Sequence, residues 1–344
     1  MGVTVNNANK CPLVSVLVPC YKSTAFINRT VESVLMQTYK NWELIMVDDC
    51  SPDNTFDILC DIARSDSRIH VYRSDKNNGK AGPTFNIAIK KSSGDFIQIL
   101  GHDDALSPDA LEKCVARHIE TGADIILPDA VFVFTDAPEK NWTMAGVVER
   151  FGKDNRHVNR SVILTGREAV IKSLDWSIHG WAMIKSDIIR KHLFCENGMN
   201  GDEYSTREFF LAANKIAFCD GKYYYYQERD SITKKLSPKI FDVWDASERL
   251  ERLLINNGFP KRIIRKFNRS RFGGYSYLLQ KFDANRAKMS AQDVEQSIRN
   301  LQLYRQSLKL YKTFFDYIFR KEKIGYKRTI VLFNIVKITY TKKH

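Results

Sequence analysis

With 344 residues, 44% of them hydrophobic and 27% charged, the chain has the composition of a globular protein with one large domain or two ordinary ones. No stretch approaches the roughly 18 continuous apolar residues that span a bilayer, and the polar segment Met1–Lys10 lacks a signal-peptide pattern. The seven cysteines form no Cys-x-x-Cys pair, which disfavours zinc and thioredoxin-like chemistry and favours a reducing cytoplasmic compartment. The net charge of +13 belongs to the C-terminal quarter, because Lys261–His344 holds 21 Lys/Arg and 5 Asp/Glu whereas residues 1–260 hold 32 and 35.

The first half of the chain alternates short, β-branched apolar runs with amphipathic segments. This order predicts an α/β domain with a largely parallel sheet. The predicted strands are Val14–Pro19, Glu43–Val47, His70–Arg73, Asp95–Leu100 and Asp124–Leu127, and the predicted helices between and after them are Ala25–Gln37, Thr55–Ala63, Pro83–Lys90 and Pro108–Glu120.

The second half changes from mixed to helical patterning. Val131–Gly166 is expected to hold loops with a hairpin, and a composition shift near Leu236–Pro238 divides the chain into residues 1–236 and 237–344. Before that boundary we expect helices Arg167–Leu174, Lys185–Lys191 and Tyr204–Asn214 and a strand at Ile216–Tyr226. After it we expect the helices Phe241–Asn256, Lys261–Phe282, Ala291–Arg320 and Ile324–Thr341.

Polar residues follow the first two predicted strands directly. In an open α/β sheet, ligands bind outside the carboxyl ends of the strands, so Tyr21 is placed to stack on a planar base and Asp49 to accept a hydrogen bond from a base or a ribose. A buried turn tyrosine and helix capping by Ser51 or Asp53 are the structural alternatives. No G-x-G-x-x-G fingerprint supports a dinucleotide site.

The most informative feature is the strand Phe96–Leu100, which runs into Asp103 and Asp104. Two adjacent carboxylates are best tolerated when a divalent cation lies between them and a phosphate. Hard oxygen ligands suit Mg²⁺ or Mn²⁺, which would stabilise a departing diphosphate. His102 either joins this site or is a solvated loop residue.

Taken in order, these motifs resemble the nucleotide-binding half of the family 2 inverting glycosyltransferases, in particular those of bacterial capsule and surface-polysaccharide synthesis. The resemblance runs from about Leu13 to Thr233. It is carried by Pro19-Cys20-Tyr21-Lys22, Gln37–Leu44, Val47–Asp53, Asn78-Gly79 with Asn86, Ser93-Gly94-Asp95 and Asp103-Asp104.

The resemblance implies the GT-A fold, a mixed sheet flanked by helices, with a nucleotide-binding half at about 13–128 and an acceptor half at about 129–236. It implies that Pro19 and Tyr21 border the nucleobase and that Asp49 binds uracil. It further implies that Asp103 touches the ribose and that Asp104, with Asp103, holds Mn²⁺ or Mg²⁺. The family often has an arginine where this chain has Phe85, which leaves Lys80 as a substitute contact to the nucleotide.

The same resemblance assigns the acceptor side. An inverting transfer needs a general base, and the family's acidic pair corresponds to Asp202-Glu203, with Glu203 in the base position and Asp202 as the alternative. Both acids also suit a helix N-terminus. His179 and Trp181 would shape the sugar or acceptor pocket, unless Trp181 is a core residue, and Arg229 is a candidate phosphate contact.

We therefore expect a metal-dependent inverting glycosyltransferase that moves a sugar from a nucleotide-sugar, UDP-linked by this resemblance, to a glycan or lipid-linked acceptor. The alternative is a non-catalytic nucleotide- or polyanion-binding protein that relies on the basic C-terminal region. That region is expected to be α-helical and either lies on an anionic membrane surface, which would make the protein peripheral at the inner face, or only packs. A nucleic-acid partner is disfavoured because no helix-turn-helix, zinc or RNA-binding motif accompanies the charge.

Overall fold

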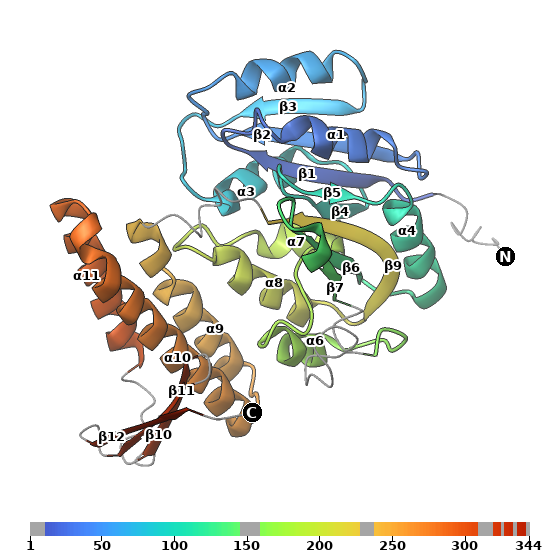
Figure 1. Ribbon diagram of the computed structural model, residues 1–344. Helices are drawn as coiled ribbons and strands as arrows, with labels where there is room; N and C mark the ends of the chain where they lie inside the picture. Colours follow the sequence, from blue (N-terminus) through green and yellow to red (C-terminus); the bar gives the residue numbers. More distant parts are fainter. Residues whose placement is uncertain are drawn as a thin grey trace. The chain divides into compact units, whose positions relative to one another are not determined.

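The computed structural model describes residues 11–144, 159–227, 237–308, 319–324, 327–332 and 336–341. It divides into two compact units (Figure 1): residues 1–196 with 201–232, and residues 197–200 with 233–344. The division after residue 232 lies close to the boundary that the composition shift predicts. Arg229 lies outside the described residues.

The first unit is built on a nine-stranded mixed sheet, whose strand order is β3-β2-β1-β4-β8-β6-β9-β5, with β7 paired to β6. Strands β1, β2, β3 and β4 are parallel to one another, as are β6 and β9, whereas β8, β5 and β7 pair antiparallel with their neighbours. The strands are β1 (Val14–Cys20), β2 (Trp42–Asp48), β3 (Ile69–Arg73), β4 (Phe96–Ile99), β5 (Ala105–Leu106), β6 (Ile125–Val133), β7 (Trp142–Thr143), β8 (Met183–Lys185) and β9 (Ile216–Tyr226).

Helices pack against this sheet, for example α3 against β1 and β2, and α4 against β6 and β9. Figure 1 shows β3, β2 and β1 in order at one end of the sheet and the long, curved β9, which pairs with the short terminal strand β5, toward the other. The helices of this unit are α1 (Ile27–Leu35), α2 (Thr55–Ala63), α3 (Ala81–Lys91), α4 (Ala110–Thr121), α6 (Gly166–Ser173), α7 (Ser186–His192) and α8 (Gly201–Ala212), with a 3-10 turn η1 (Pro138–Lys140).

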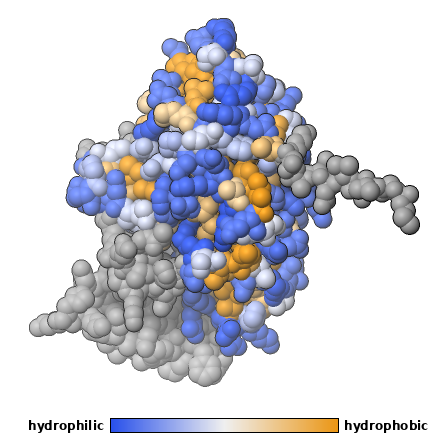
Figure 2. Space-filling model, turned by 90° about the vertical axis from the view of Figure 1, so that its right-hand side faces the viewer, coloured by the Kyte–Doolittle hydropathy of each residue, from blue (hydrophilic) through white to orange (hydrophobic). Residues whose placement is uncertain are grey.

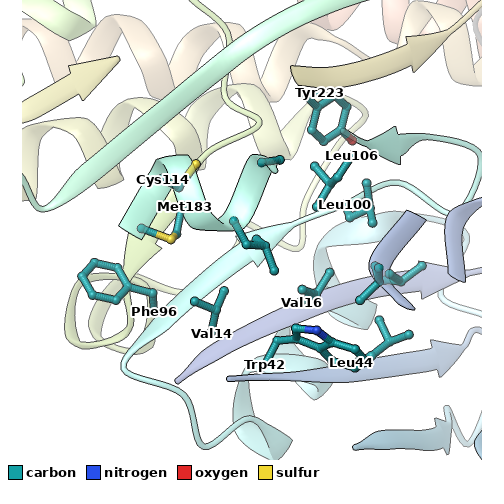
Figure 3. Packing of buried hydrophobic residues seen from close by; sticks show 14 of the residues in the cluster. Val14, Val16, Trp42, Leu44, Phe96, Leu100, Leu106, Cys114, Met183 and Tyr223 are labelled. Atoms are coloured by element: carbon teal, nitrogen blue, oxygen red, sulfur yellow. The ribbon is translucent and has the colours of Figure 1, made fainter. Parts of the chain in front are cut away.

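The core explains why the strand ends are fixed in place. All seven residues of β1 are buried, which is typical of a strand covered on both faces of a sheet. Figure 3 shows Val14 and Val16 of β1 packed near Trp42 and Leu44 of β2, with Tyr223 of β9 in the same cluster. The loops that follow these strands therefore start from rigid positions.

The second unit contains the helices of the basic C-terminal region, and its last part corrects the sequence-based expectation. The final described segments form an antiparallel three-stranded sheet where the helix Ile324–Thr341 was expected. The helix predicted for Ala291–Arg320 is described as far as Leu308, and Phe319 and Arg320 lie in a strand instead. β-Branched residues are frequent in these strands, and such residues lose side-chain freedom in a helix and favour strands. The elements are η2 (Pro238–Phe241), α9 (Trp244–Asn256), α10 (Lys261–Asn285), η3 (Arg286–Lys288), α11 (Ala291–Leu308), β10 (Phe319–Ile324), β11 (Lys327–Leu332) and β12 (Val336–Thr341).

The surface is mostly polar on the face drawn in Figure 2, where apolar residues form small separate groups. Within the described ranges, no helix combines the length and the apolar character needed to cross a membrane.

Candidate active site

Tyr21 and Asp49 follow the parallel strands β1 and β2 at the same edge of the sheet. The Asp49 N–H donates to the Cys20 carbonyl oxygen at 2.8 Å, which joins the two strand ends. Tyr21 is 36% exposed, and its ring is thus available to a ligand. Pro19 is instead buried within β1, opposite Val47, and directly precedes the Cys20 and Tyr21 that end and follow the strand.

Asp49 is buried and organises the loop before α3. Its carboxylate oxygens accept hydrogen bonds from the Asn78 N–H at 3.0 and 3.1 Å, from the Asn78 side-chain amide at 2.6 Å and from the Gly79 N–H at 3.2 Å. Gly79 has φ +68°, a left-handed conformation that glycine adopts without strain. The loop leads to Lys80, which is half-buried at the N-terminus of α3. The sequence-predicted residues Tyr21, Asp49 and Lys80 thus belong to connected loops.

The two carboxylates after β4 have different surroundings. Asp104 is 3% exposed, and it accepts hydrogen bonds from the Tyr223 hydroxyl at 2.7 Å and from the Tyr226 N–H at 3.1 Å. The pKa of Asp104 is raised to about 8, chiefly by burial and next by the charge of Asp103, against the lowering effect of the donors from β9. Asp103 is only half-buried. Asp104 therefore ties the turn to β9, whereas Asp103 is the carboxylate open to a ligand.

Arg29 and Tyr223 support this turn, and sequence reasoning missed both. The Arg29 guanidinium lies 3.6 Å from the centroid of the Tyr226 ring and donates to the Asp103 carbonyl oxygen at 2.5 Å. The Tyr223 hydroxyl also accepts the Gly101 N–H at 3.0 Å. Both residues are far from the turn in sequence, so only the folded chain reveals these roles.

An aromatic cluster extends from the carboxylate turn. The Trp181 ring stacks on Tyr223 at 5.0 Å and on Tyr225 at 4.5 Å between centroids. Trp176 meets Trp181 edge-on at 6.2 Å, and it is 45% exposed with φ +61°. A left-handed conformation is unusual for so bulky a residue and commonly marks a functional position. The cluster thus leads from the carboxylates to an exposed indole.

His179 supports Trp181 from within the protein. Its Nε2 lies 2.8 Å from the Pro128 carbonyl oxygen and must donate, so its Nδ1 accepts the Trp181 N–H at 3.1 Å. The pKa of His179 is lowered to about 4, chiefly by burial and next by the Arg160 guanidinium. Both nitrogens are therefore occupied, and His179 is neutral at pH 7, which leaves it no free polar atom for a sugar.

A pH dependence of stability follows from His179. The unfolded chain binds a proton at the ordinary pKa of about 6.5, whereas the folded chain binds it only near 4. We expect the free energy of unfolding to fall by about 3 kcal/mol as the pH falls from 6.5 to 4 because of this residue. Urea unfolding of His179→Gln should show a flatter profile over this window, and a profile equal to that of the wild type would contradict this role of His179.

The two acids of α8 also differ. Glu203 pairs with the buried Arg207, which in turn donates to the Ser173 carbonyl oxygen at 2.6 Å. Burial raises the pKa of Glu203, Asp202 raises it further and Arg207 lowers it. The Asp202 side chain is exposed at the surface, but the surrounding protein desolvates its carboxyl group and raises its pKa. Burial raises the pKa of Tyr225, and the charges of Asp104, Asp103 and Asp202 raise it further, so Asp202 is within electrostatic reach of the ring beside the carboxylate turn.

Phe85, which stands where the family often has an arginine, is a buried core residue. Phe85 is 6% exposed and stacks on Phe194 at 4.7 Å. The neighbouring Asn86 amide donates to the Phe194 carbonyl oxygen at 2.9 Å. This position therefore holds α3 against the segment before α8 and offers no group to a phosphate.

The carboxylate turn is suited to a hard divalent cation that is shared with a substrate. Within the described part of the chain, no three His, Cys, Asp or Glu side chains lie close enough to hold a metal by themselves. Mg²⁺ is usually bound through one or two carboxylates together with substrate phosphates. The half-buried Asp103 beside Asp104 fits that requirement.

The mixed sheet, the carboxylates at the end of β4 and the acids at the start of α8 define a GT-A glycosyltransferase. The chain belongs to glycosyl transferase family 2, whose family model matches residues 15–179. It is 30% identical over 224 residues to the glycosyltransferase GlyG of Streptococcus pneumoniae serotype 4. The aligned region covers 63% of this chain and 71% of GlyG.

Two further proteins are similar to this chain. One is the UDP-Glc:alpha-D-GlcNAc-diphosphoundecaprenol beta-1,3-glucosyltransferase WfgD of Escherichia coli, with 44% identity over 109 residues, 31% of this chain and 42% of WfgD. The other is the crystal structure of S. aureus TarS 1–349 in complex with UDP-GlcNAc, with a TM-score of 0.61 and 18% identity over 96% of this chain and 99% of that chain. The likeness to TarS shows the fold.

Proposed function

We propose that this glycosyltransferase moves a sugar from a UDP-linked donor to an acceptor hydroxyl with inversion at the anomeric carbon. The observation that carries the proposal is the carboxylate turn after β4, in which Tyr223 and Tyr226 of β9 hold Asp104 and leave Asp103 half-buried. These carboxylates would bind the diphosphate through a metal, and Asp202, whose charge raises the pKa of the nearby Tyr225, would contact the acceptor. WfgD is named for a UDP-Glc donor, and the TarS crystal structure is a complex with UDP-GlcNAc, which together support the donor class.

On the donor side, Tyr21 stacks on the base, and Asp49 holds the loop that carries Lys80 toward the phosphates. A bound Mn²⁺ or Mg²⁺ would neutralise the charge that develops on the leaving diphosphate. Asp103 is the carboxylate that would hold this ion, because Asp104 directs its oxygens to Tyr223 and Tyr226. Asp104 and Arg29 fix the shape of the turn.

On the acceptor side, Asp202 takes the proton from the attacking hydroxyl. The family resemblance implies Glu203 as the base, but its carboxylate is engaged by Arg207, whereas Asp202 is exposed. Glu203 then positions α8 through Arg207 and the Ser173 carbonyl. Trp181 and Trp176 offer apolar ring faces for the sugars of a glycan or lipid-linked acceptor, as expected in surface-polysaccharide synthesis.

The donor class is tested by calorimetric titration of the purified protein with UDP, GDP, CDP and ADP, each with and without Mn²⁺. We expect UDP to bind more tightly than the other three and Mn²⁺ to strengthen its binding. Tighter binding of another nucleotide would overturn the UDP assignment, and no binding of any nucleotide by folded protein would overturn the function.

Loss of the Tyr21 ring should weaken this binding. Stacking of a base on an aromatic side chain contributes about 1–3 kcal/mol, so Tyr21→Ala should raise the Kd for UDP by roughly five- to 150-fold. Tyr21→Phe keeps the ring and should bind as the wild type does. Equal Kd values for the alanine and phenylalanine variants would show that Tyr21 does not stack on the base.

A further inference from the structure

The helix α10 begins with a dense group of cations. It spans 25 residues, and its first turn has no acidic residue. Five basic residues within its first nine are all exposed. At 3.6 residues per turn they fall within an arc of about 140° on the helix surface. This α10 basic surface consists of Lys261, Arg262, Arg265, Lys266 and Arg269.

The opposite side of α10 holds its unit together. Arg271 is 3% exposed, pairs with Glu251 of α9 and donates to the Ser307 hydroxyl of α11 at 2.8 Å. Phe282 is buried in the apolar cluster of the same unit. Internal packing thus uses Arg271 and Phe282, and the α10 basic surface faces away from it.

The arrangement of these cations opposes the stability of their own helix. Positive charge near a helix N-terminus is unfavourable because the macrodipole is positive there. Like charges four residues apart also repel, and three such pairs occur here: Lys261 with Arg265, Arg262 with Lys266, and Arg265 with Arg269. Local features that oppose folding are commonly functional. An anionic partner over this surface would relieve both effects.

Farther along the same helix, two apolar side chains are exposed. Tyr277 is 60% exposed and Leu279 is 37% exposed. A free polyanion or a nucleic acid gains little from exposed apolar groups, whereas tyrosine and leucine suit the boundary between lipid headgroups and acyl chains. We propose that α10 docks the protein on an anionic phospholipid membrane, with the basic surface on the headgroups and Tyr277 and Leu279 at the interface. This docking does not depend on the proposed catalytic roles.

The test is co-sedimentation with phosphatidylcholine vesicles that contain or lack phosphatidylglycerol. The docking variant carries Lys261→Gln, Arg262→Gln, Arg265→Gln and Arg269→Gln. The control variant carries Arg64→Gln, Lys90→Gln, Arg167→Gln and Lys191→Gln, four exposed cations of the first unit. Both variants reduce the formal net charge from +13 to +9, because each loses four positive charges.

We expect wild type and the control variant to bind only the anionic vesicles, and high salt to release them. Each cation near an anionic surface strengthens binding about fivefold, so the docking variant should bind several hundredfold more weakly. Its thermal midpoint should equal or exceed that of the wild type, since repulsion within α10 is relieved. Lys261→Gln/Arg265→Gln is a milder variant, expected to lose roughly 25-fold.

Three results would overturn the proposal. One is equal binding of the wild type to vesicles with and without phosphatidylglycerol, or to neither. Another is an equal loss of binding, or none, in the docking and control variants. The third is binding of a short RNA or DNA duplex, but not of anionic vesicles, through the same four residues, which would assign the surface to nucleic acid.

Discussion

Asp202→Asn should lower the turnover of the enzyme by two to four orders of magnitude, the contribution expected of a general base. Asp202 is exposed on the first turn of α8, and its charge reaches the Tyr225 ring beside the carboxylate turn. An amide in its place cannot take the proton from the acceptor hydroxyl. The Kd for UDP should stay unchanged, because the nucleobase loops lie on other elements. Steady-state kinetics and calorimetry on the same preparation measure both quantities.

Glu203→Gln is the matched comparison at the neighbouring position. Its carboxylate is paired with the buried Arg207, and loss of the negative charge should chiefly lower stability. We expect a lower thermal midpoint and turnover within about tenfold of the wild type at temperatures where the variant is folded. If Glu203→Gln instead loses the larger share of turnover while Asp202→Asn stays active, the base is Glu203, as the family resemblance implies.

Asp103→Asn should remove most of the dependence on divalent metal. Asp103 is the half-buried carboxylate of the turn, whereas Asp104 is engaged by Tyr223 and Tyr226. Without Asp103, a cation would lose its most accessible protein ligand and with it much of the stabilisation of the leaving diphosphate. We expect turnover to fall on the order of a thousandfold. Electron paramagnetic resonance of free Mn²⁺, in the presence of UDP, should show weaker binding of the ion.

Two further variants test whether metal binding depends on Asp103 itself or on any negative charge near the site. Asp75→Asn removes an exposed carboxylate that follows β3 and should bind Mn²⁺ as the wild type does. Asp104→Asn should chiefly disturb the attachment of the turn to β9. Wild-type Mn²⁺ affinity in Asp103→Asn, together with its loss in Asp104→Asn, would return the metal to Asp104, the residue that the family resemblance assigns.

The fold of the first unit was largely predictable because its information is local. Buried apolar strands are recognisable in the sequence, and Tyr21, Asp49 and Asp103 follow them closely. This pattern predicts both the sheet and the edge of the sheet where a ligand binds. The short strands β5, β7 and β8 were not expected, since two or three residues carry too little periodicity. The last two strands, Lys327–Leu332 and Val336–Thr341, fall in the segment assigned to the helix Ile324–Thr341, because its Lys and Arg residues are interleaved with apolar ones at spacings that also fit a helix.

The contacts that shape the site were less accessible to sequence reasoning. Arg29 lies in an amphipathic helix and would be taken for a solvated residue, yet it contacts Asp103 from 74 positions away. Tyr223 holds Asp104 from 119 positions away. His179 was expected to line the sugar pocket, but its ring nitrogens bond to main-chain groups. Such roles depend on tertiary contacts that no local pattern encodes.

The stereochemistry of donor hydrolysis tests the central claim most directly, since water can replace the unidentified acceptor. The purified enzyme is incubated with Mn²⁺ and α-linked UDP-sugars, and proton NMR records which anomer of the free sugar appears first, before mutarotation. Inverting chemistry with Asp202 as base predicts the β-anomer first, and no such release from Asp202→Asn. Initial release of the α-anomer, or no turnover of any donor by folded wild-type protein, would contradict the account.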